Sequence, residues 1–351
     1  MHINELLKTA RESRASDVHI TADRNPLFRI DGSLRETEYN LTVDEKKEMI
    51  LSLLTEKQRK LVEEGKDVDT SYETADKMRH RVNVYHQQQR LATAIRLLNE
   101  HIPTFEELNL PDALRQLAEE PRGLILITGP TGSGKSTSLA AMIDYINTMR
   151  HCHILTIEDP VEYVYTQKNS LIHQRNVGED VESFSAALRS AMREDPDVIL
   201  VGEMRDFETI SAAITAAETG HLVLSTLHTT GAAMTVDRII DVFPPHSQHQ
   251  IRTQLAGVLK GVVTQTLLPR ASGTGRVAAF EIMIGTDAVS TMIREGKGHQ
   301  LNSVIQTGIR QGMVLLDDYL LNLVRSGTIT QSAAMEKASN KTEFTAALGR
   351  P

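Results

Sequence analysis

The chain has 351 residues, of which 40% are hydrophobic and 24% are charged. One hydrophobic core rarely serves a chain of this length, so we expect two domains, and the ordinary composition excludes a largely disordered chain. Asp and Glu outnumber Lys and Arg by 46 to 38, only 4% of the residues are aromatic, and there is no Trp. These counts disfavour direct nucleic-acid binding, which uses basic patches or aromatic stacking platforms.

Cys152 is the only cysteine, which excludes an internal disulfide and a CxxC zinc module and fits a reducing compartment. The residues after Met1 lack a basic segment followed by an apolar one, so we expect no signal peptide. No apolar run approaches the ~20 residues that cross a bilayer. We therefore predict a cytoplasmic protein without membrane insertion, which reaches the membrane only through partners.

Residues 1–98 predict a small α/β domain. Residues 43–64 place apolar residues at helical spacing on a polar background, as in a surface helix or a pair of helices. Four short segments are strand-like, namely residues 16–21, 26–30, 79–84 and 93–97. Residues 99–112 contain chain breakers and predict a linker to a second domain.

Residues 113–351 predict the second domain, in which strands and helices alternate. Helical patterns such as residues 184–193 and 210–219 separate the strands, and Gly220 follows the latter helix as a C-terminal cap. Four apolar runs are dense enough to be strands buried on both faces, residues 124–128, 153–157, 198–201 and 222–226. This order is typical of an α/β fold with a parallel sheet and crossover helices, and from about residue 288 the pattern is mainly helical.

A phosphate-binding loop of the form GxxxxGK[ST] follows the first of these strands and opens a helix. It consists of Gly129, Pro130, Thr131, Gly132, Ser133, Gly134, Lys135 and Ser136, with Thr137 next in the helix. Glycines let backbone N–H groups face phosphate oxygens, and the helix N-terminus adds partial positive charge. We expect Lys135 to neutralise the β- and γ-phosphates of ATP and Ser136 to ligate Mg²⁺. The alternative, a glycine-rich turn without a ligand, is disfavoured by the strand and helix on either side.

Two carboxylates follow other strands of the predicted sheet. Ligands collect at the carboxyl ends of parallel strands, and a carboxylate beside a nucleotide is unfavourable unless it binds Mg²⁺ or orients water. We expect Glu203 to polarise the attacking water. The usual Walker B pattern has an Asp where this chain has Gly202, so Glu158 is the candidate to act through Mg²⁺ or its waters. The alternative that these carboxylates merely cap the following helices stays open.

His221 and His228 bracket the strand that begins at Leu222. Their spacing of seven residues does not suit a metal pair on one helix, which disfavours zinc. We expect His228, at the ligand edge of the sheet, to contact the γ-phosphate. His221, at the other end of the strand, fits a role in fold stability or a subunit contact. Without further context, a structural role for either histidine remains open.

Four blocks occur in the order and spacing of one known family. They resemble the Walker A, Asp box, atypical Walker B and His box of the secretion ATPases of type II secretion and type IV pili, and they span residues 129–136, 154–163, 195–206 and 219–230. Residues 15–20 resemble the start of the PAS-like N-terminal domain of these proteins. The resemblance implies a RecA-like ATPase core, a smaller PAS-like domain and a homo-hexameric ring.

Within this family the chain resembles the retraction motors of type IV pili, including residues 296–318. The assembly and type II secretion branches usually carry a four-cysteine module that one cysteine cannot form. Residues 288–295 read AVSTMIRE where retraction motors have AIRNLIRE, so Ser290 and Thr291 depart from the motif. The resemblance implies that Arg81 and Arg96 reach the nucleotide of a neighbouring subunit, where guanidinium groups stabilise phosphoryl charge. Surface arginines without that role are the alternative.

The combined prediction is Mg²⁺-dependent ATP hydrolysis by a homo-hexamer that powers pilus retraction at the inner face of the cytoplasmic membrane. The resemblance implies a platform protein of that membrane as the partner. Three alternatives stay open. The protein could be a pilus-assembly or type II secretion ATPase, a nucleotide-dependent regulatory module that hydrolyses little, or a RecA-like nucleic-acid motor.

Overall fold

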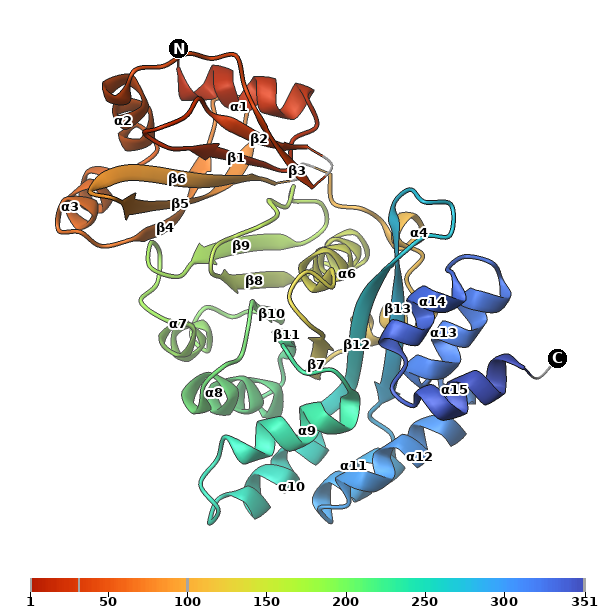
Figure 1. Cartoon of the computed structure of the whole chain (residues 1–351). Helices are drawn as coiled ribbons and strands as arrows, with labels where there is room; N and C mark the ends of the chain where they lie inside the picture. The colour runs from red at the N-terminus through yellow and green to blue at the C-terminus, as the bar shows by residue number, and fades with distance from the viewer. Residues whose placement is uncertain (1, 31, 99–100, 350–351) are drawn as a thin grey trace. The chain divides into compact units, whose positions relative to one another are not determined.

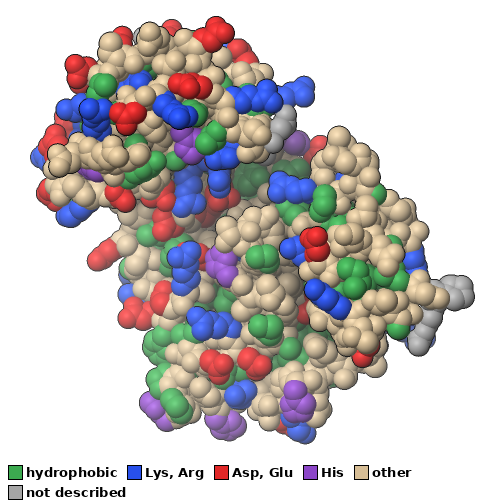
Figure 2. Space-filling model, in the orientation of Figure 1, with side chains coloured by type: hydrophobic (Ala, Val, Ile, Leu, Met, Phe, Trp, Pro, Cys, Tyr) green, Lys and Arg blue, Asp and Glu red, His purple; other side chains and the backbone are tan. Residues whose placement is uncertain are grey.

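A computed structural model of the chain describes residues 2–30, 32–98 and 101–349. The chain divides into two compact units, each with its own sheet (Figure 1). The first unit comprises Met1–His101 and Pro160–Val164, and the second comprises Ile102–Asp159 and Tyr165–Pro351. Lys and Arg side chains are interspersed with Asp and Glu side chains over both units on the face drawn in Figure 2.

In the described residues of the first unit, six strands form an antiparallel sheet in the order β3-β2-β1-β6-β5-β4. The elements are α1 (Ile3–Glu12), β1 (Asp17–Ile20), β2 (Leu27–Ile30), β3 (Ser33–Glu36), α2 (Val43–Leu51), α3 (Glu56–Glu63), β4 (Val68–Glu73), β5 (Arg79–Gln87) and β6 (Arg90–Leu97). The predicted strands are all present, residues 43–64 contain two helices, and the structure adds β3 and β4.

The helices of the first unit form one core with one face of its sheet. Each helix begins at a capping box, in which the N-cap and N3 side chains satisfy backbone N–H groups that have no partner within the helix. The apolar face of α1 contributes Leu6 and Leu7, and β5 contributes Val82 and Val84 to the same cluster. The alternate positions of β5 point to the opposite, polar face, where Arg81 lies.

The predicted linker contains a short helix, α4 (Phe105–Leu108). Thr104 and Glu107 form a capping box at its start, and Asn109 ends it in the left-handed conformation with φ 51°. Residues 99 and 100 of the predicted linker lie outside the described residues.

The described residues of the second unit contain a seven-stranded sheet in the order β13-β12-β7-β11-β10-β8-β9. All neighbouring strands are parallel except β13, which is antiparallel to β12 at the edge. The strands are β7 (Gly123–Thr128), β8 (His153–Glu158), β9 (Leu171–Asn176), β10 (Val198–Val201), β11 (Leu222–Leu227), β12 (Leu259–Pro269) and β13 (Arg276–Ile284). Every residue of β7, β10 and β11 is buried, which confirms the α/β prediction for this part of the chain.

Helices pack against this sheet and extend beyond it (Figure 1). They are α5 (Asp112–Ala118), α6 (Lys135–Met149), α7 (Phe184–Ala191), α8 (Phe207–Glu218), α9 (Ala232–Asp241), α10 (Gln248–Val258), α11 (Asp287–Arg294), α12 (Leu301–Thr307), α13 (Leu316–Arg325), α14 (Gln331–Lys337) and α15 (Lys341–Leu348). The last three form a small apolar cluster with β12 and β13, which includes Leu268 and Phe344. The predicted helical character after residue 287 is confirmed. None of the described helices combines the length and apolar character that a bilayer crossing requires.

Candidate nucleotide site

The phosphate-binding loop, residues 129–136, joins β7 to α6 and uses glycines at its tightest points. Gly129, Gly132 and Gly134 have φ values of 139°, 78° and 89°, which side chains rarely tolerate. A Cβ on Gly129 would lie 2.2 Å from the carbonyl oxygen of Gln265, and one on Gly134 would lie 2.8 Å from its Nε2. The loop therefore packs directly on Gln265 of β12. Gly129 and Gly134 are required both because their φ values are positive and because a side chain at either position would collide with Gln265.

Two side chains of the loop fit an anionic ligand. Lys135 is 8% exposed, and its Nζ donates hydrogen bonds to the carbonyl oxygens of Gly129 at 2.8 Å and Pro130 at 3.0 Å. The Ser133 hydroxyl is buried and has no hydrogen-bond partner among the described residues. A buried polar group without a partner costs free energy that a bound acceptor would recover. This arrangement fits the phosphate oxygens of a nucleotide.

Helix α6 presents its N-terminus to the same loop. Gly134 occupies the N-cap position, and it has no side chain that could satisfy the first N–H groups of the helix. The other end of this first turn is anchored, since Ser138 Oγ donates to Gln265 Oε1 at 2.8 Å. At the end of β7, the hydroxyls of Thr128 and Thr264 lie 2.8 Å apart. Strand β12 thus holds both the entry to the loop and the helix that leaves it, as a helix-terminal anion site requires.

The strand order sets how far each candidate residue lies from the loop. The loop follows β7, His228 follows β11, Glu203 follows β10, and Glu158 ends β8. Neighbouring strands are about 4.8 Å apart, so the end of β10 lies ~10 Å from the end of β7 and the end of β8 lies ~14 Å from it. Glu203 is therefore the nearer carboxylate, and Glu158 is the more distant one.

The structure brings Glu203 and His228 together. The Oε2 atom of Glu203 lies 3.6 Å from Nε2 of His228, and it forms an ion pair with Nε of Arg205 at 2.8 Å. Thr226 Oγ1 donates to the carbonyl oxygen of Gly202 at 2.6 Å, which ties the end of β10 to β11. Arg205 is a member of the cluster that the sequence did not single out, although it lies only two residues beyond Glu203.

Gly202, where the usual pattern has an Asp, lies in a tightly packed place at the end of β10. A Cβ on Gly202 would lie 3.3 Å from the carbonyl oxygen of Ile157 and 3.4 Å from Cα of Glu158. The Gly202 N–H also donates to that carbonyl oxygen at 2.8 Å. Strands β10 and β8 lie close together here, so a larger residue at position 202 would require its neighbours to move by a few tenths of an ångström.

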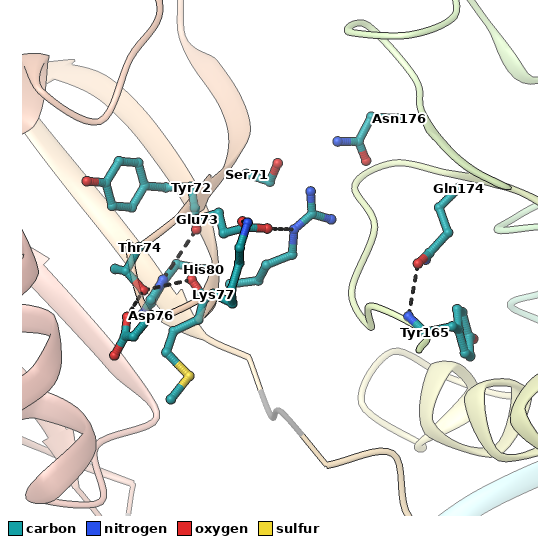
Figure 3. Close-up of polar contacts among 12 residues, drawn as sticks. Ser71, Tyr72, Glu73, Thr74, Asp76, Lys77, His80, Tyr165, Gln174 and Asn176 are labelled. Atoms are coloured by element: carbon teal, nitrogen blue, oxygen red, sulfur yellow. Dashed lines mark hydrogen bonds and ion pairs between the residues drawn. The ribbon is translucent and has the colours of Figure 1, made fainter. Parts of the chain in front are cut away.

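Hydrogen bonds orient the Glu158 carboxylate. Its Oε1 accepts from Thr156 Oγ1 at 2.7 Å and from Gln174 Nε2 at 3.5 Å. Gln174 also accepts from the backbone N–H of Tyr165 at 3.0 Å, as Figure 3 shows. The described residues hold no group of three or more His, Cys, Asp or Glu side chains arranged for a metal ion.

His221 has structural partners at the start of β11, the end of the strand remote from His228. Its Nδ1 lies 2.9 Å from the carbonyl oxygen of Ala216 and 3.3 Å from Thr219 Oγ1. These contacts join the end of α8 to the start of β11. They favour the first of the two roles predicted for His221, fold stability, and the subunit contact stays a prediction.

Arg81 and Arg96 lie directly opposite one another on β5 and β6 of the first unit. Arg81 Nη2 donates to Asp69 at 2.7 Å, and Arg96 Nε donates to Asp17 at 3.0 Å. The two guanidinium groups therefore share the polar face of that sheet and are held by carboxylates. Their contact with a nucleotide of a neighbouring subunit stays a prediction.

The AVSTMIRE segment lies in and just after α11, and its apolar stripe packs into the core through Val289 and Ile293. Ser290 and Thr291 replace the arginine and asparagine of the motif. Ser290 Oγ donates to the carbonyl oxygen of Ala256 at 2.9 Å, and Thr291 Oγ1 donates to that of Asp287 at 2.8 Å. Both substitutes thus make local contacts, and the first ties α11 to α10.

A phosphate-binding loop between a parallel strand and a helix, with carboxylates at neighbouring strand ends, defines a RecA-like P-loop ATPase core. The family comparison agrees with this class. The chain belongs to the family of type II/IV secretion system proteins, whose family model matches residues 1–345. The predicted family membership is confirmed.

Within this family, the chain is more similar to pilus retraction ATPases than to a type II secretion ATPase. The chain is 48% identical to the type IV pilus retraction ATPase PilT of Pseudomonas aeruginosa over 98% of this chain and 100% of that protein. A crystal structure of the pilus retraction motor PilT with bound ADP superposes with a TM-score of 0.92 at 46% identity and covers 98% of each chain. The type II secretion system protein E of the same bacterium is 32% identical over 94% of this chain and 68% of that protein.

Proposed function

We propose that this protein is an ATP-hydrolysing motor that powers type IV pilus retraction. The observation that carries the proposal is the loop of residues 129–136 on β12, with Lys135 buried against it, in a chain similar over its full length to a retraction ATPase. The similar PilT structure holds ADP. The glycine turns, the unpaired Ser133 hydroxyl and the N-terminus of α6 support nucleotide binding at the same loop here.

The chemistry assigns a role to each residue of the site. Loop N–H groups and Lys135 hold the phosphates and neutralise part of their charge. Mg²⁺, when bound, supplies further charge neutralisation, and the Ser136 hydroxyl together with Glu158 acting through water would hold it. Glu203 polarises the attacking water as general base, and His228 beside it contacts the γ-phosphate. A ~14 Å span from β7 to β8 supports the water-mediated role for Glu158.

The motor acts as a homo-hexamer in which Arg81 and Arg96 reach the nucleotide of the neighbouring subunit. Their position on one polar sheet face supports this role, because a pair of guanidinium groups suits phosphoryl charge. The hexamer works at the inner face of the cytoplasmic membrane through a platform protein of the pilus. The domains of this subunit are residues 1–98, a linker at 99–112, and an ATPase domain at 113–351.

A pair of matched variants tests the two carboxylates. We expect Glu203→Gln to bind ATP and to release phosphate about 100-fold more slowly or worse, because the general base is lost. Glu158→Gln should require more Mg²⁺ for half-maximal turnover and recover at high Mg²⁺. Glu218→Gln, on α8, is the control and should behave as wild type. Wild-type turnover by Glu203→Gln would refute the role of Glu203 as the general base. If Glu158→Gln released no phosphate even at saturating Mg²⁺, Glu158 would be the general base and Glu203 the residue that acts through Mg²⁺.

The direction of the motor is tested in its host. Similarity at 48% to the retraction ATPase against 32% to the type II secretion protein favours retraction. Deletion of the gene should therefore leave cells with surplus, immobile pili. Cells without pili would indicate assembly instead. Purified protein without Mg²⁺-dependent phosphate release would indicate the regulatory module, and stimulation of turnover by DNA would indicate a nucleic-acid motor.

A further inference from the structure

Glu281 is a buried carboxylate on β13 that the chemistry above does not use. It is 9% exposed and interrupts an apolar strand segment, residues 278–283. In register it faces Thr264 of β12, which in turn pairs with Thr128 at the start of the phosphate-binding loop. Paired residues point to the same face of a sheet, so the three side chains share one face. A charge at this depth requires partners.

The first partner of Glu281 is helix α9. Its Oε1 accepts a hydrogen bond from the backbone N–H of Ala232, the first residue of α9, at 2.8 Å. Gly231 precedes that residue as N-cap and has no side chain to do this. A Cβ on Gly231 would lie 3.7 Å from the same oxygen, so the carboxylate occupies the place of a capping side chain.

The second partner is helix α13. Burial raises the pKa of the Glu281 carboxyl, and the backbone N–H of Leu316, the first residue of α13, lies near enough to lower it in part. Leu315 occupies the N-cap position and, in the described part of the chain, provides no capping side chain. Two backbone hydrogen bonds between Ile282 and Val314, of 2.9 and 3.1 Å, hold this segment beside β13. One carboxylate therefore lies at the starts of two helices whose N-cap residues provide no capping side chain, and it is hydrogen-bonded to the first of them.

Helix α9 is joined directly to the His box. Residues 229–231 connect His228 to the first turn of α9. The Thr235 side chain, in that turn, forms hydrogen bonds with this connecting segment. Thr235 Oγ1 lies 2.6 Å from Thr229 Oγ1 and donates to the carbonyl oxygen of Gly231 at 2.7 Å. Because these contacts tie the turn to the helix, a shift in the start of α9 displaces the segment that follows His228.

We propose that Glu281 is a positioning residue for ATP hydrolysis, which fixes His228 opposite Glu203 by anchoring the start of α9 to β13 and α13. The inference rests on the hydrolytic function proposed above. Glu281 does not touch the nucleotide, and it acts through the backbone of residues 229–232. It also makes the His box sensitive to the position of the C-terminal helices, because α13 shares the same carboxylate.

The test compares Glu281→Gln with a cap removed elsewhere. Gln keeps one oxygen, but an amide oxygen is a weaker acceptor than a carboxylate and an N–H₂ group replaces the second oxygen, so the interaction with both helix N-termini is weakened. We expect kcat to fall about tenfold while the KM for ATP stays within about twofold, as for a group that supports the reacting residues without binding substrate. The control, Thr330→Ala, removes the N-cap of α14 and should keep wild-type kcat.

Two further measurements keep the test decisive. Hydrogen exchange should accelerate at the starts of both α9 and α13 in Glu281→Gln, and only at α14 in Thr330→Ala. Adding Gly231→Ser to Glu281→Gln places a capping hydroxyl at α9 and should recover kcat. If Glu281→Gln does not fold, Glu281→Asp, which retains the charge but is one methylene shorter, replaces it with the same expected pattern.

Wild-type kcat in a folded Glu281→Gln protein, or equal losses in it and Thr330→Ala, would overturn the inference. Failure of the proposed function has a different signature, because the wild-type protein would then release no phosphate at all.

Discussion

His80 on β5 makes the stability of the first unit depend on pH. The ring is 1% exposed, its Nδ1 lies 3.3 Å from the carbonyl oxygen of Tyr72, and its Nε2 lies 3.4 Å from Arg11 Nη2 (Figure 3 shows the Tyr72 contact). These contacts suit a neutral ring that donates from Nδ1 and accepts at Nε2. Burial, with the Arg11 charge as second cause, lowers the pKa of His80 from 6.5 to about 4.

The size and sign of the effect follow from this pKa. The unfolded chain takes up a proton near pH 6.5, whereas the folded chain takes it up only near pH 4, so the unfolded state binds more protons between these values. The stabilisation is complete above pH 6.5 and is lost as the pH falls toward 4. At about 1.36 kcal/mol for each pH unit, the difference amounts to ~3 kcal/mol.

The assay is urea unfolding of the full chain between pH 7.5 and pH 4, with a variant that removes the titrating group. The variant is His80→Gln. When its free energy of unfolding is subtracted from that of the wild type at each pH, the contributions of all other titrating groups cancel. Hydrogen exchange of the β5 amides, corrected for intrinsic rates, reports the first unit separately. We expect the wild type to lose ~3 kcal/mol more than the variant over this range. Parallel pH profiles, or an imidazole pKa near 6.5 by NMR, would refute the reasoning.

Two predictions concern the loop itself. Lys135→Ala should abolish phosphate release, because the ammonium that neutralises the phosphates is removed; turnover above one hundredth of the wild-type rate would contradict this. Gly129→Ala should weaken nucleotide binding and lower the free energy of unfolding by about 1–3 kcal/mol, because φ is 139° and the new Cβ would lie 2.2 Å from the Gln265 carbonyl oxygen. Gly132→Ala, with open space around its Cβ, is its milder control in calorimetry and nucleotide titration.

The strands of the second unit were predictable where burial on both faces leaves a continuous apolar run. Strands β7, β10 and β11 are of this kind. Strands β9, β12 and β13 were not predicted. Only Ile172 and Asn176 of the six residues of β9 are buried, and β9 lies at the sheet edge. Polar residues such as Gln265 and Glu281 interrupt the apolar pattern of β12 and β13. Strand β3 of the first unit is exposed along its whole length, so its sequence carries no alternation. Edge strands depend on pairing that a local pattern does not contain.

The candidate site was predictable in its residues and less so in its arrangement. Motifs place Glu158, Glu203 and His228 at the ligand edge of a parallel sheet, but no motif says in which order the strands lie. The structure inserts β11 and β10 between β7 and β8, which puts His228 beside the loop and Glu158 farthest from it. Long-range pairing decides that order, and the sequence of each strand alone does not encode it.

The residues that sequence reasoning missed had a signal of their own. Gln265 and Glu281 are polar residues inside apolar strands, and buried polar groups are hydrogen-bonded in folded proteins. Each of them therefore predicts a hydrogen-bonding partner in the folded protein. In register, Gln265 pairs with Phe280 and Glu281 with Thr264, so the two polar side chains are one position apart and point to opposite faces. Gln265 of β12 packs against the phosphate-binding loop on one face, and Glu281 of β13 bonds to the start of α9 on the other. Because β12 and β13 are paired along nine residue positions, the hairpin connects the support of the loop with the support of the helix that follows the His box.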